Sequence, residues 1–70
     1  MWTKGTIEGY GYEAKHFEEE SGYGISEGRI SKLAITKDGA MAANYDRGWD
    51  IRPKTAEAER IYRMLLKKFN

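Results

Sequence analysis

Seventy residues, 40% of them hydrophobic and 33% charged, provide the core of one small domain and exclude a second. The absence of cysteine excludes disulfides, thiolate metal sites and cysteine nucleophiles, and it favours a cytoplasmic setting. The net charge is +1, and no apolar run approaches the ~20 residues of a membrane-spanning helix, so we expect no membrane partner.

Charge is distributed unevenly along the chain. Residues 1–28 contain two lysines and six glutamates, a net charge of −4, so residues 29–70 carry +5 within the total of +1. If the two halves separate in space, the domain has an acidic and a basic region, which favours charge-complementary partners or self-association. If they interleave in an antiparallel sheet, their charges cancel locally.

The first expected element is a β-hairpin near the N-terminus. Residues 2–8 pair with residues 10–17 in this interpretation, and the turn lies near Gly9. Alternation along the second strand places Tyr12, Ala14 and His16 on one face of the sheet and Glu13, Lys15 and Phe17 on the other.

The stretch EEESGYGISEG, residues 18–28, predicts an exposed connection, the longest loop in the chain. Its three consecutive glutamates lack the alternating ligand spacing of a calcium loop. Its glycines precede a strand, whereas a phosphate cradle needs the N-terminus of a helix. We therefore expect neither a metal nor a cofactor.

A second hairpin follows, with strands over residues 29–37 and 40–46 joined at Asp38-Gly39. A two-residue loop would place Ile35 opposite Ala42, so the larger apolar residues of the two strands would not share the buried face. We prefer a three-residue loop, residues 37–39, with Gly39 in the left-handed region as a bulge. That loop creates two cross-strand pairs on the buried face: Ile35 with Met41, and Leu33 with Ala43.

The last element is an amphipathic helix, for which Thr55 is a plausible N-cap shortly after Pro53. A single apolar stripe of helical period contains Ala58, Ile61, Tyr62, Leu65, Leu66 and Phe69. The expected architecture is an α+β fold in the order β-β-β-β-α. In it, a four-stranded antiparallel sheet made of two β-hairpins has the C-terminal helix packed on one face.

Catalysis has little support in the sequence. The one histidine, His16, falls at the end of a half-buried strand face, and no serine or aspartate stands beside it in a nucleophile or orienting pattern. We interpret His16 as structural, predict no catalytic residue and expect the protein not to be an enzyme.

The segment NYDRGWD, residues 44–50, concentrates recognition-capable side chains around one glycine. In the structural interpretation, alternation along the strand makes Tyr45 continue a buried face that includes Met41 and Ala43. Gly48 lets the chain turn, and Trp49 covers a small core. The other interpretation is a binding surface, since tyrosine, tryptophan and arginine are enriched at interaction hot spots. With one residue from the glycine-rich loop, the candidate interaction residues are Tyr23, Arg47, Trp49 and Asp50.

Nucleic-acid binding is the alternative function. Arg60, Arg63 and Lys67 share one face of the expected helix. The total charge is nevertheless near zero, and Glu59 with Arg63 forms an ordinary ion pair between successive turns of a helix. We therefore prefer protein–protein contact or self-association, with a possible homodimer.

The pattern of the whole chain resembles a family of small uncharacterised domains from Firmicutes and their phages. The resemblance covers residues 2–69 and rests on WTKGTIEGYGYEAKHF, SGYGISEGRISKL, NYDRGWD and the terminal amphipathic helix; YGISEGRISKL and YDRGWD are its most specific parts. It implies a bacterial or phage origin and binding to a host or phage macromolecule, and it transfers no functional residue.

Overall fold

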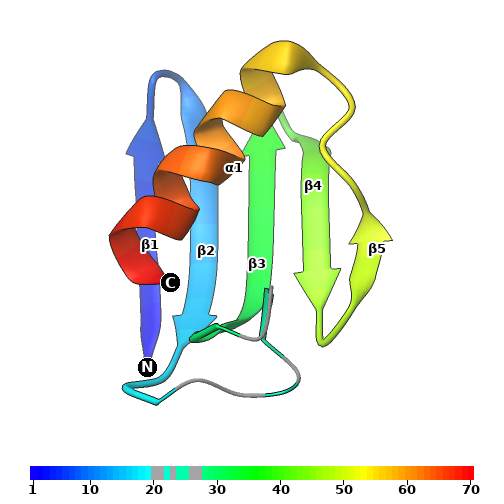
Figure 1. Ribbon diagram of the computed structural model, residues 1–70. Helices are drawn as coiled ribbons and strands as arrows, with labels where there is room; N and C mark the ends of the chain where they lie inside the picture. Colours follow the sequence, from blue (N-terminus) through cyan, green and yellow to red (C-terminus); the bar gives the residue numbers. More distant parts are fainter. Residues whose placement is uncertain (20–21, 23, 26–27) are drawn as a thin grey trace.

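The computed structural model describes residues 1–19, 22, 24–25 and 28–70, and it contains one sheet and one helix (Figure 1). The strands are β1 (Trp2–Ile7), β2 (Tyr10–His16), β3 (Ile30–Lys37), β4 (Ala40–Asp46) and β5 (Trp49–Ile51), and the helix is α1 (Ala56–Phe69). All strand pairs are antiparallel and follow the chain, in the order β1-β2-β3-β4-β5. The α+β class with a C-terminal helix is confirmed.

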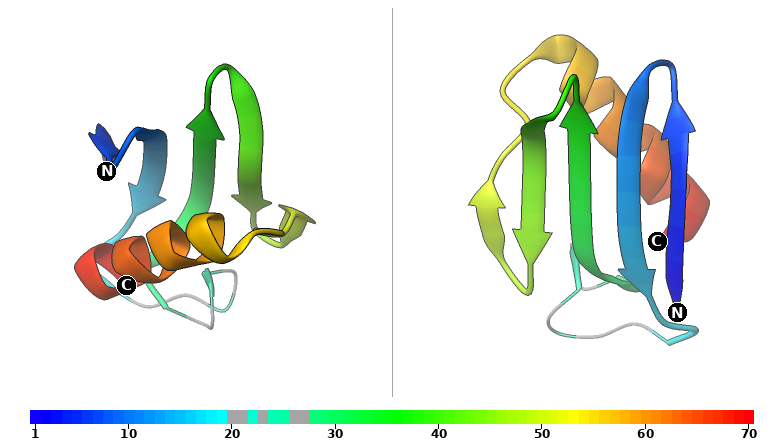
Figure 2. Two further views of the ribbon diagram at one scale, coloured as in Figure 1. Left: turned by 90° about the horizontal axis from the view of Figure 1, so that it is seen from above. Right: turned by 180° about the vertical axis from the view of Figure 1, so that it is seen from behind.

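The helix lies on one face of the sheet and crosses it diagonally, from the side where β3 ends and β4 begins toward β1 (Figure 1). The view from behind shows that the described residues place no helix on the other face of the sheet (Figure 2). We call the helix-covered side the inner face and the opposite side the outer face. No helix in the described part of the chain is long and apolar enough to cross a membrane.

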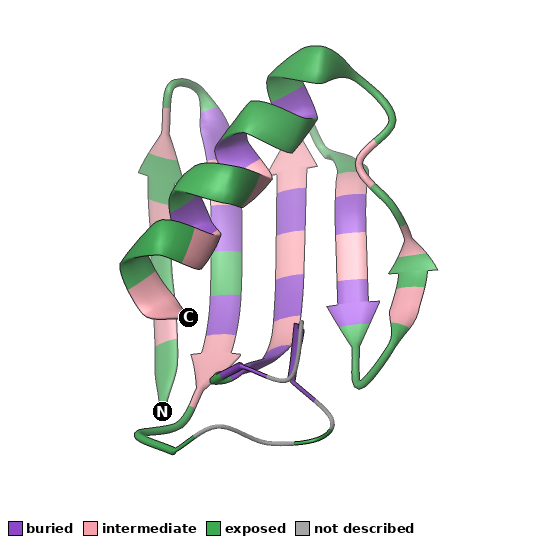
Figure 3. Cartoon of the chain, viewed as in Figure 1, coloured by how far each residue is buried: buried purple, intermediate pink, exposed green. Residues whose placement is uncertain are grey.

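The core lies between the inner face and α1, where buried positions alternate along the central strands (Figure 3). Alternation is the expected pattern for strands with one covered and one uncovered face. The largest fully buried side chains are Ile25, Ile30, Leu33, Ile35, Ile61 and Leu65. Every member of the apolar helix stripe is either buried in this core or packed against it.

The expectation of four strands is wrong, because Trp49–Ile51 forms a fifth strand that pairs with β4. Three residues are too few to show an alternating apolar pattern in the sequence. Their pairing depends on the turn after β4, in which the backbone N–H of Asp46 donates to the carbonyl of Gly48 at 2.9 Å. The residue with positive φ in this turn is Arg47, at 60°, and not Gly48.

The expected three-residue loop between β3 and β4 is also wrong. Lys37 pairs with Ala40 across a two-residue turn, in which Asp38 and Gly39 have φ values of 52° and 79°. A bulge follows, because Thr36 pairs with Met41 and Ile35 pairs with Ala43, so that one residue of β4 is unmatched. The observed buried-face pairs are Ile35 with Ala43 and Leu33 with Tyr45.

This bulge explains which residues of β4 are buried. The unmatched residue reverses the parity of the strand, so Met41 lies on the outer face with 45% exposure while Ala43 and Tyr45 are buried. The expectation that Tyr45 continues the buried face is therefore confirmed, and the expectation that Met41 belongs to that face is wrong.

The first hairpin agrees with the sequence. Ile7 pairs with Tyr10, and the turn residues Glu8 and Gly9 have φ values of 49° and 86°. Positive φ at both central residues is the geometry that fits the right-handed twist of a two-residue hairpin. Glu8 is an unusual residue for this conformation, and its side chain has a partner on the helix that is described below.

The predicted N-cap of the helix is confirmed. The Thr55 backbone is extended, and its side-chain oxygen accepts a hydrogen bond from the backbone N–H of Ala58 at 3.0 Å. Glu57 and Glu59 lie in the first turn and Lys67 and Lys68 in the last, where the helix dipole favours these charges. The sequence thus defines where α1 begins.

Removing this cap gives the first testable prediction. Thr55→Ala should lower the free energy of unfolding by about 1 kcal/mol, because the N–H of Ala58 loses its acceptor. Thr55→Ser keeps a hydroxyl and is the matched control. Urea titrations of both variants provide the measurement; equal midpoints for alanine and serine would contradict the assigned role of the cap.

Candidate protein-interaction surface

Trp49, a candidate from the sequence, packs against the core. Its ring makes edge contacts with Tyr45 of β4 and Tyr62 of α1, at centroid distances of 5.1 and 5.2 Å. The Arg52 guanidinium lies 5.5 Å from the same ring. Burial raises the pKa of the Tyr62 hydroxyl. The expectation that Trp49 covers the core is confirmed, and these contacts occupy much of its aromatic surface.

Two of the other candidates from the sequence, Arg47 and Asp50, lie in the turn after β4 and in β5. Arg47 is exposed at the turn after β4, where its backbone N–H donates to the Ser31 carbonyl at 3.0 Å. Asp50 accepts a hydrogen bond from the Asn44 side chain at 3.3 Å. Tyr23 lies outside the described residues. The segment at residues 44–50 therefore includes the turn and most of the strand that form one edge of the sheet.

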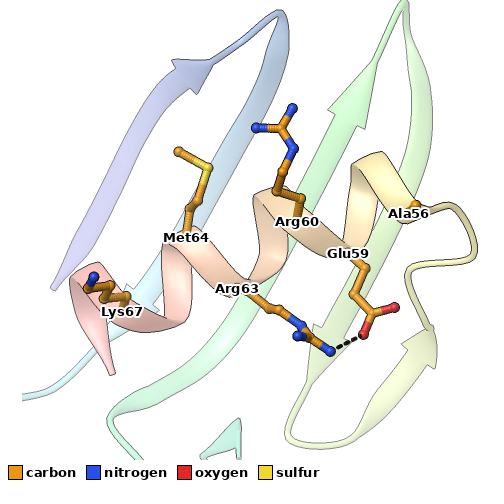
Figure 4. A pocket seen from close by; sticks show the side chains of 6 residues that line it. All are labelled: Ala56, Glu59, Arg60, Arg63, Met64 and Lys67. Carbon is orange, nitrogen blue, oxygen red and sulfur yellow. Dashed lines mark hydrogen bonds and ion pairs between the residues drawn. The ribbon is translucent and has the colours of Figure 1, made fainter.

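The basic helix face contains Arg60, Arg63 and Lys67, which line an open hollow together with Ala56, Glu59 and Met64 (Figure 4). Arg60 donates two hydrogen bonds to the Glu8 carboxylate, at 2.6 and 2.8 Å. Arg63 donates to Glu59 at 3.0 Å, one helical turn away. Two of the three cations are thus engaged with carboxylates.

The contact between Glu8 and Arg60 also joins the acidic and the basic half of the chain. Glu8 belongs to the acidic half and Arg60 to the basic half, 52 residues further along the chain. Lys37 and Glu57 form a second contact between the sheet and the helix, at 3.0 Å. Opposite charges therefore meet across the fold at these two contacts.

The pair of Glu8 and Arg60 predicts a specific pH dependence. Hydrogen bonds from Arg60 lower the pKa of the Glu8 carboxyl, so the folded state favours the ionised form more than the unfolded state does. The resulting stability is present above the unfolded-state pKa and is lost as the pH falls through the lowered folded-state pKa. Wild type should be more stable than Glu8→Gln at neutral pH, and the difference should vanish in acid.

Urea midpoints of the two proteins across the acid range measure this difference. Because the pair is exposed, added salt should reduce it as well. Glu13→Gln is a useful control, since Glu13 also lies beside a lysine, Lys4, at 3.4 Å, but on the outer face. A difference for Glu8→Gln that persists unchanged in acid would contradict the assignment.

The structure reveals a second group of candidate residues that the sequence analysis missed. Trp2 is 54% exposed and Phe17 is 44% exposed, although a core of this size could use both. The ammonium of Lys15 lies 6.0 Å from the Trp2 ring and 5.6 Å from the Phe17 ring, so one lysine links the two aromatics. We call Trp2, Lys15 and Phe17 the Trp2 corner.

Strand parity explains the location of the Trp2 corner. Trp2 pairs with Lys15 and therefore shares its face of the sheet, which is the outer face because Tyr12 and Ala14 point into the core. Met1, 71% exposed, adjoins this corner. The sequence of the first hairpin already shows which residues alternate between the two faces of the sheet. Extending this alternation to the first strand would have placed Trp2 on the same face as Lys15 and Phe17.

The Trp2 corner lies beside an edge strand. β1 is the outermost strand of the described sheet and pairs on one side with β2 (Figure 2). An edge strand presents main-chain donors and acceptors in addition to its side chains. This corner of the molecule therefore combines exposed aromatic surface with a row of hydrogen-bonding groups.

His16 lies between Lys15 and Phe17 in the chain and contributes to packing on the inner face at the end of β2. Its Nε2 lies 2.9 Å from the Thr3 hydroxyl, and its ring stacks on Phe69 at a centroid distance of 4.8 Å. These contacts agree with the structural interpretation of this residue. Among the described residues, no group of three or more histidine, cysteine, aspartate or glutamate side chains could hold a metal ion.

The fold and surface define a small α+β domain with one helix on a five-stranded antiparallel meander and exposed aromatic residues at its first strand. The chain belongs to a family described as a domain of unknown function, DUF7678, whose match covers residues 1–70. No curated protein and no solved structure matches the chain.

Proposed function

We propose that this domain is a non-enzymatic protein-binding module and that its contact surface is the Trp2 corner with the adjoining edge of β1. The observation that carries the proposal is the exposure of Trp2 and Phe17, 54% and 44%, on one corner beside an edge strand. Exposed aromatic surface of this kind is typical of protein interaction sites. The contact is made with another protein or with a second copy of the chain.

Comparison with the other aromatic residues supports this choice of surface. Tyr10, Tyr12 and Tyr45 are buried in the core, and Trp49 packs against two tyrosines in edge-to-face contacts. Removing Trp49 from the core to bind a partner would break these contacts. Trp2 loses no such packing when a partner covers it, so binding energy from its burial is fully available.

Nucleic-acid binding through Arg60, Arg63 and Lys67 has weaker support. A phosphate would have to compete with the two hydrogen bonds from Arg60 to Glu8 and with the bond from Arg63 to Glu59. The net charge of +1 also provides little attraction toward a polyanion. The absence of cysteine supports a cytoplasmic setting for the module, and the resemblance noted from the sequence supports a bacterial or phage origin.

Photo-crosslinking in cells that contain the natural partners tests the proposal. A photoreactive phenylalanine analogue is placed at Trp2 in one protein and at Met64 in a matched control, because Met64 is an exposed apolar residue on the helix. We expect discrete covalent adducts from position 2, either with another protein or with a second copy, and none from position 64. Adducts with nucleic acid, or no adduct from position 2, would contradict the proposal.

A further inference from the structure

The main-chain groups at the outer edge of β1 can be assigned to particular residues. The N–H of His16 donates to the carbonyl of Met1 at 2.9 Å, and the β1–β2 hairpin closes at the pair of Ile7 and Tyr10. Hydrogen-bonded and non-hydrogen-bonded pairs alternate in an antiparallel ladder. Odd-numbered residues of β1 therefore bond to β2, whereas Trp2, Lys4 and Thr6 direct their N–H and C=O groups to the outer edge.

The same three residues carry their side chains on the outer face, because their partners in β2 are Lys15, Glu13 and Gly11. An added antiparallel strand must match both properties. The residues of the added strand that hydrogen-bond to β1 must carry their side chains on the outer face as well. The reason is that cross-strand partners point to the same side of a sheet. β1 of a second copy satisfies this requirement when even-numbered residues pair with even-numbered residues.

We propose, as a refinement that rests on the proposed function, that the partner is a second copy of this chain and that the two β1 strands pair antiparallel across a two-fold axis at Thr3. In this arrangement Trp2 of each copy lies opposite Lys4 of the other, and Thr3 lies opposite Thr3. The two bonded pairs contribute about four main-chain hydrogen bonds. The pairing joins the two five-stranded sheets into one continuous sheet with both helices on the same side.

The charged residues of β1 favour this register over those with the axis further along the strand. An axis at Lys4 would place Lys4 directly opposite Lys4, and like charges in facing positions are destabilising. An axis at Gly5 would place Trp2 opposite Glu8, which belongs to the turn and bonds to Arg60. The axis at Thr3 instead places an ammonium beside an indole ring, a contact that Lys15 already makes with Trp2 within one chain at 6.0 Å.

Two further features favour a second copy as the occupant. Lysine on an edge strand usually discourages strand addition, but Glu13 lies 3.4 Å from the Lys4 ammonium and compensates its charge. The net charge of +1 leaves little repulsion between identical chains. Across the axis the two Trp2 rings occupy diagonal positions on the outer face, within reach of each other, so each covers apolar surface of the other.

Sedimentation velocity over a wide concentration range tests the self-association. We expect wild type to form dimers as concentration rises and Lys4→Pro to raise the dimer dissociation constant by about tenfold or more, because proline removes an outward N–H from each copy. The bonds between β1 and β2 do not use this N–H, so Lys4→Pro should keep the wild-type circular dichroism spectrum. Lys4→Ala, which loses the ammonium but keeps the N–H, is the matched control and should dimerise more tightly than Lys4→Pro.

A cysteine crosslink tests the register without relying on proline. The chain contains no cysteine, and facing residues in a non-hydrogen-bonded pair are close enough for a disulfide. Thr3→Cys should therefore form covalent dimers under mild oxidation much faster than Thr6→Cys, which lies away from the axis. Equal crosslinking rates for the two variants would overturn the register.

The outcomes separate this inference from the proposed function. A wild type that stays monomeric at every concentration, or a Lys4→Pro variant that dimerises as wild type does, overturns the β1 pairing. Equal weakening by Lys4→Ala and Lys4→Pro also overturns it, because the side chain and not the strand edge would then carry the contact. If position 2 still crosslinks to a different protein, the binding module stands and only the second copy is rejected.

Discussion

Ile61→Ala is expected to lower the free energy of unfolding by about 3 kcal/mol. Ile61 is fully buried on the face of α1 that packs against the sheet, so alanine leaves a cavity that the surrounding strands can fill only in part. A domain of seventy residues has a total stability of about 4 to 10 kcal/mol, so this one change removes a large share of it. Urea denaturation at a fixed temperature measures the loss.

Met64→Ala is the matched control for this experiment. Met64 lies one turn from Ile61 on the exposed face of the same helix and is 39% exposed. Its replacement should change the free energy of unfolding by no more than about 0.5 kcal/mol, because it fills no space in the core. If the two substitutions cost the same, α1 does not pack on the sheet through the face that contains Ile61.

Trp49→Ala should lower the free energy of unfolding by about 2 kcal/mol. A fully buried tryptophan costs more than this, but Trp49 is partly exposed and contributes chiefly through its edge contacts with Tyr45 and Tyr62. Thermal unfolding followed by far-ultraviolet circular dichroism provides the measurement. An unchanged melting temperature would contradict the structural role and restore Trp49 as a binding residue.

Two comparisons make the Trp49 result specific. Trp49→Phe keeps an aromatic edge beside both tyrosines and should lose less than half of the stability that alanine loses. Trp2→Ala should leave the melting temperature close to that of wild type at low protein concentration, since the Trp2 ring is mostly exposed. We therefore expect the two tryptophans to affect different measurements: Trp49 affects the melting temperature, whereas Trp2 affects association.

The helix and both two-residue turns show how far local sequence patterns specify this fold. The stripe that includes Ile61 and Leu65 has helical period, and Thr55 precedes it with the correct capping chemistry, so the helix was predictable. Gly9 and Gly39 each occupy a position that needs positive φ, which indicates where the two turns lie, although the length of the second turn was predicted wrongly. These features depend on residues that are close together in the chain.

The register of β4 was less predictable, because the sequence AMAAN contains only one bulky apolar residue, Met41. Burying one face of such a strand gains little over burying the other, so the pattern does not locate a bulge. The fifth strand has the same limitation, since its pairing depends on the left-handed conformation of Arg47, a residue that seldom adopts it.

The exposed Trp2 corner could not be recognised from composition, because large aromatic residues in a short chain are first assigned to the core. Asn70 was missed for a different reason. Its side chain donates to the Ile25 carbonyl at 3.1 Å and accepts from the N–H of Ile30 at 3.0 Å, which connects the end of the helix to the segment before β3. No local pattern relates residues 40 or more positions apart.

This junction has a consequence for the unfolding rate of the protein. Each strand pairs with the next along the chain, so the longest connection that the sheet has to close is the one between His16 and Ile30. Contacts of Asn70 with Ile25 and Ile30 form only when the helix docks, and we expect this step to follow the rate-limiting one. Strengthening the junction would then slow unfolding and prolong the lifetime of the folded chain, with little change in the speed of folding.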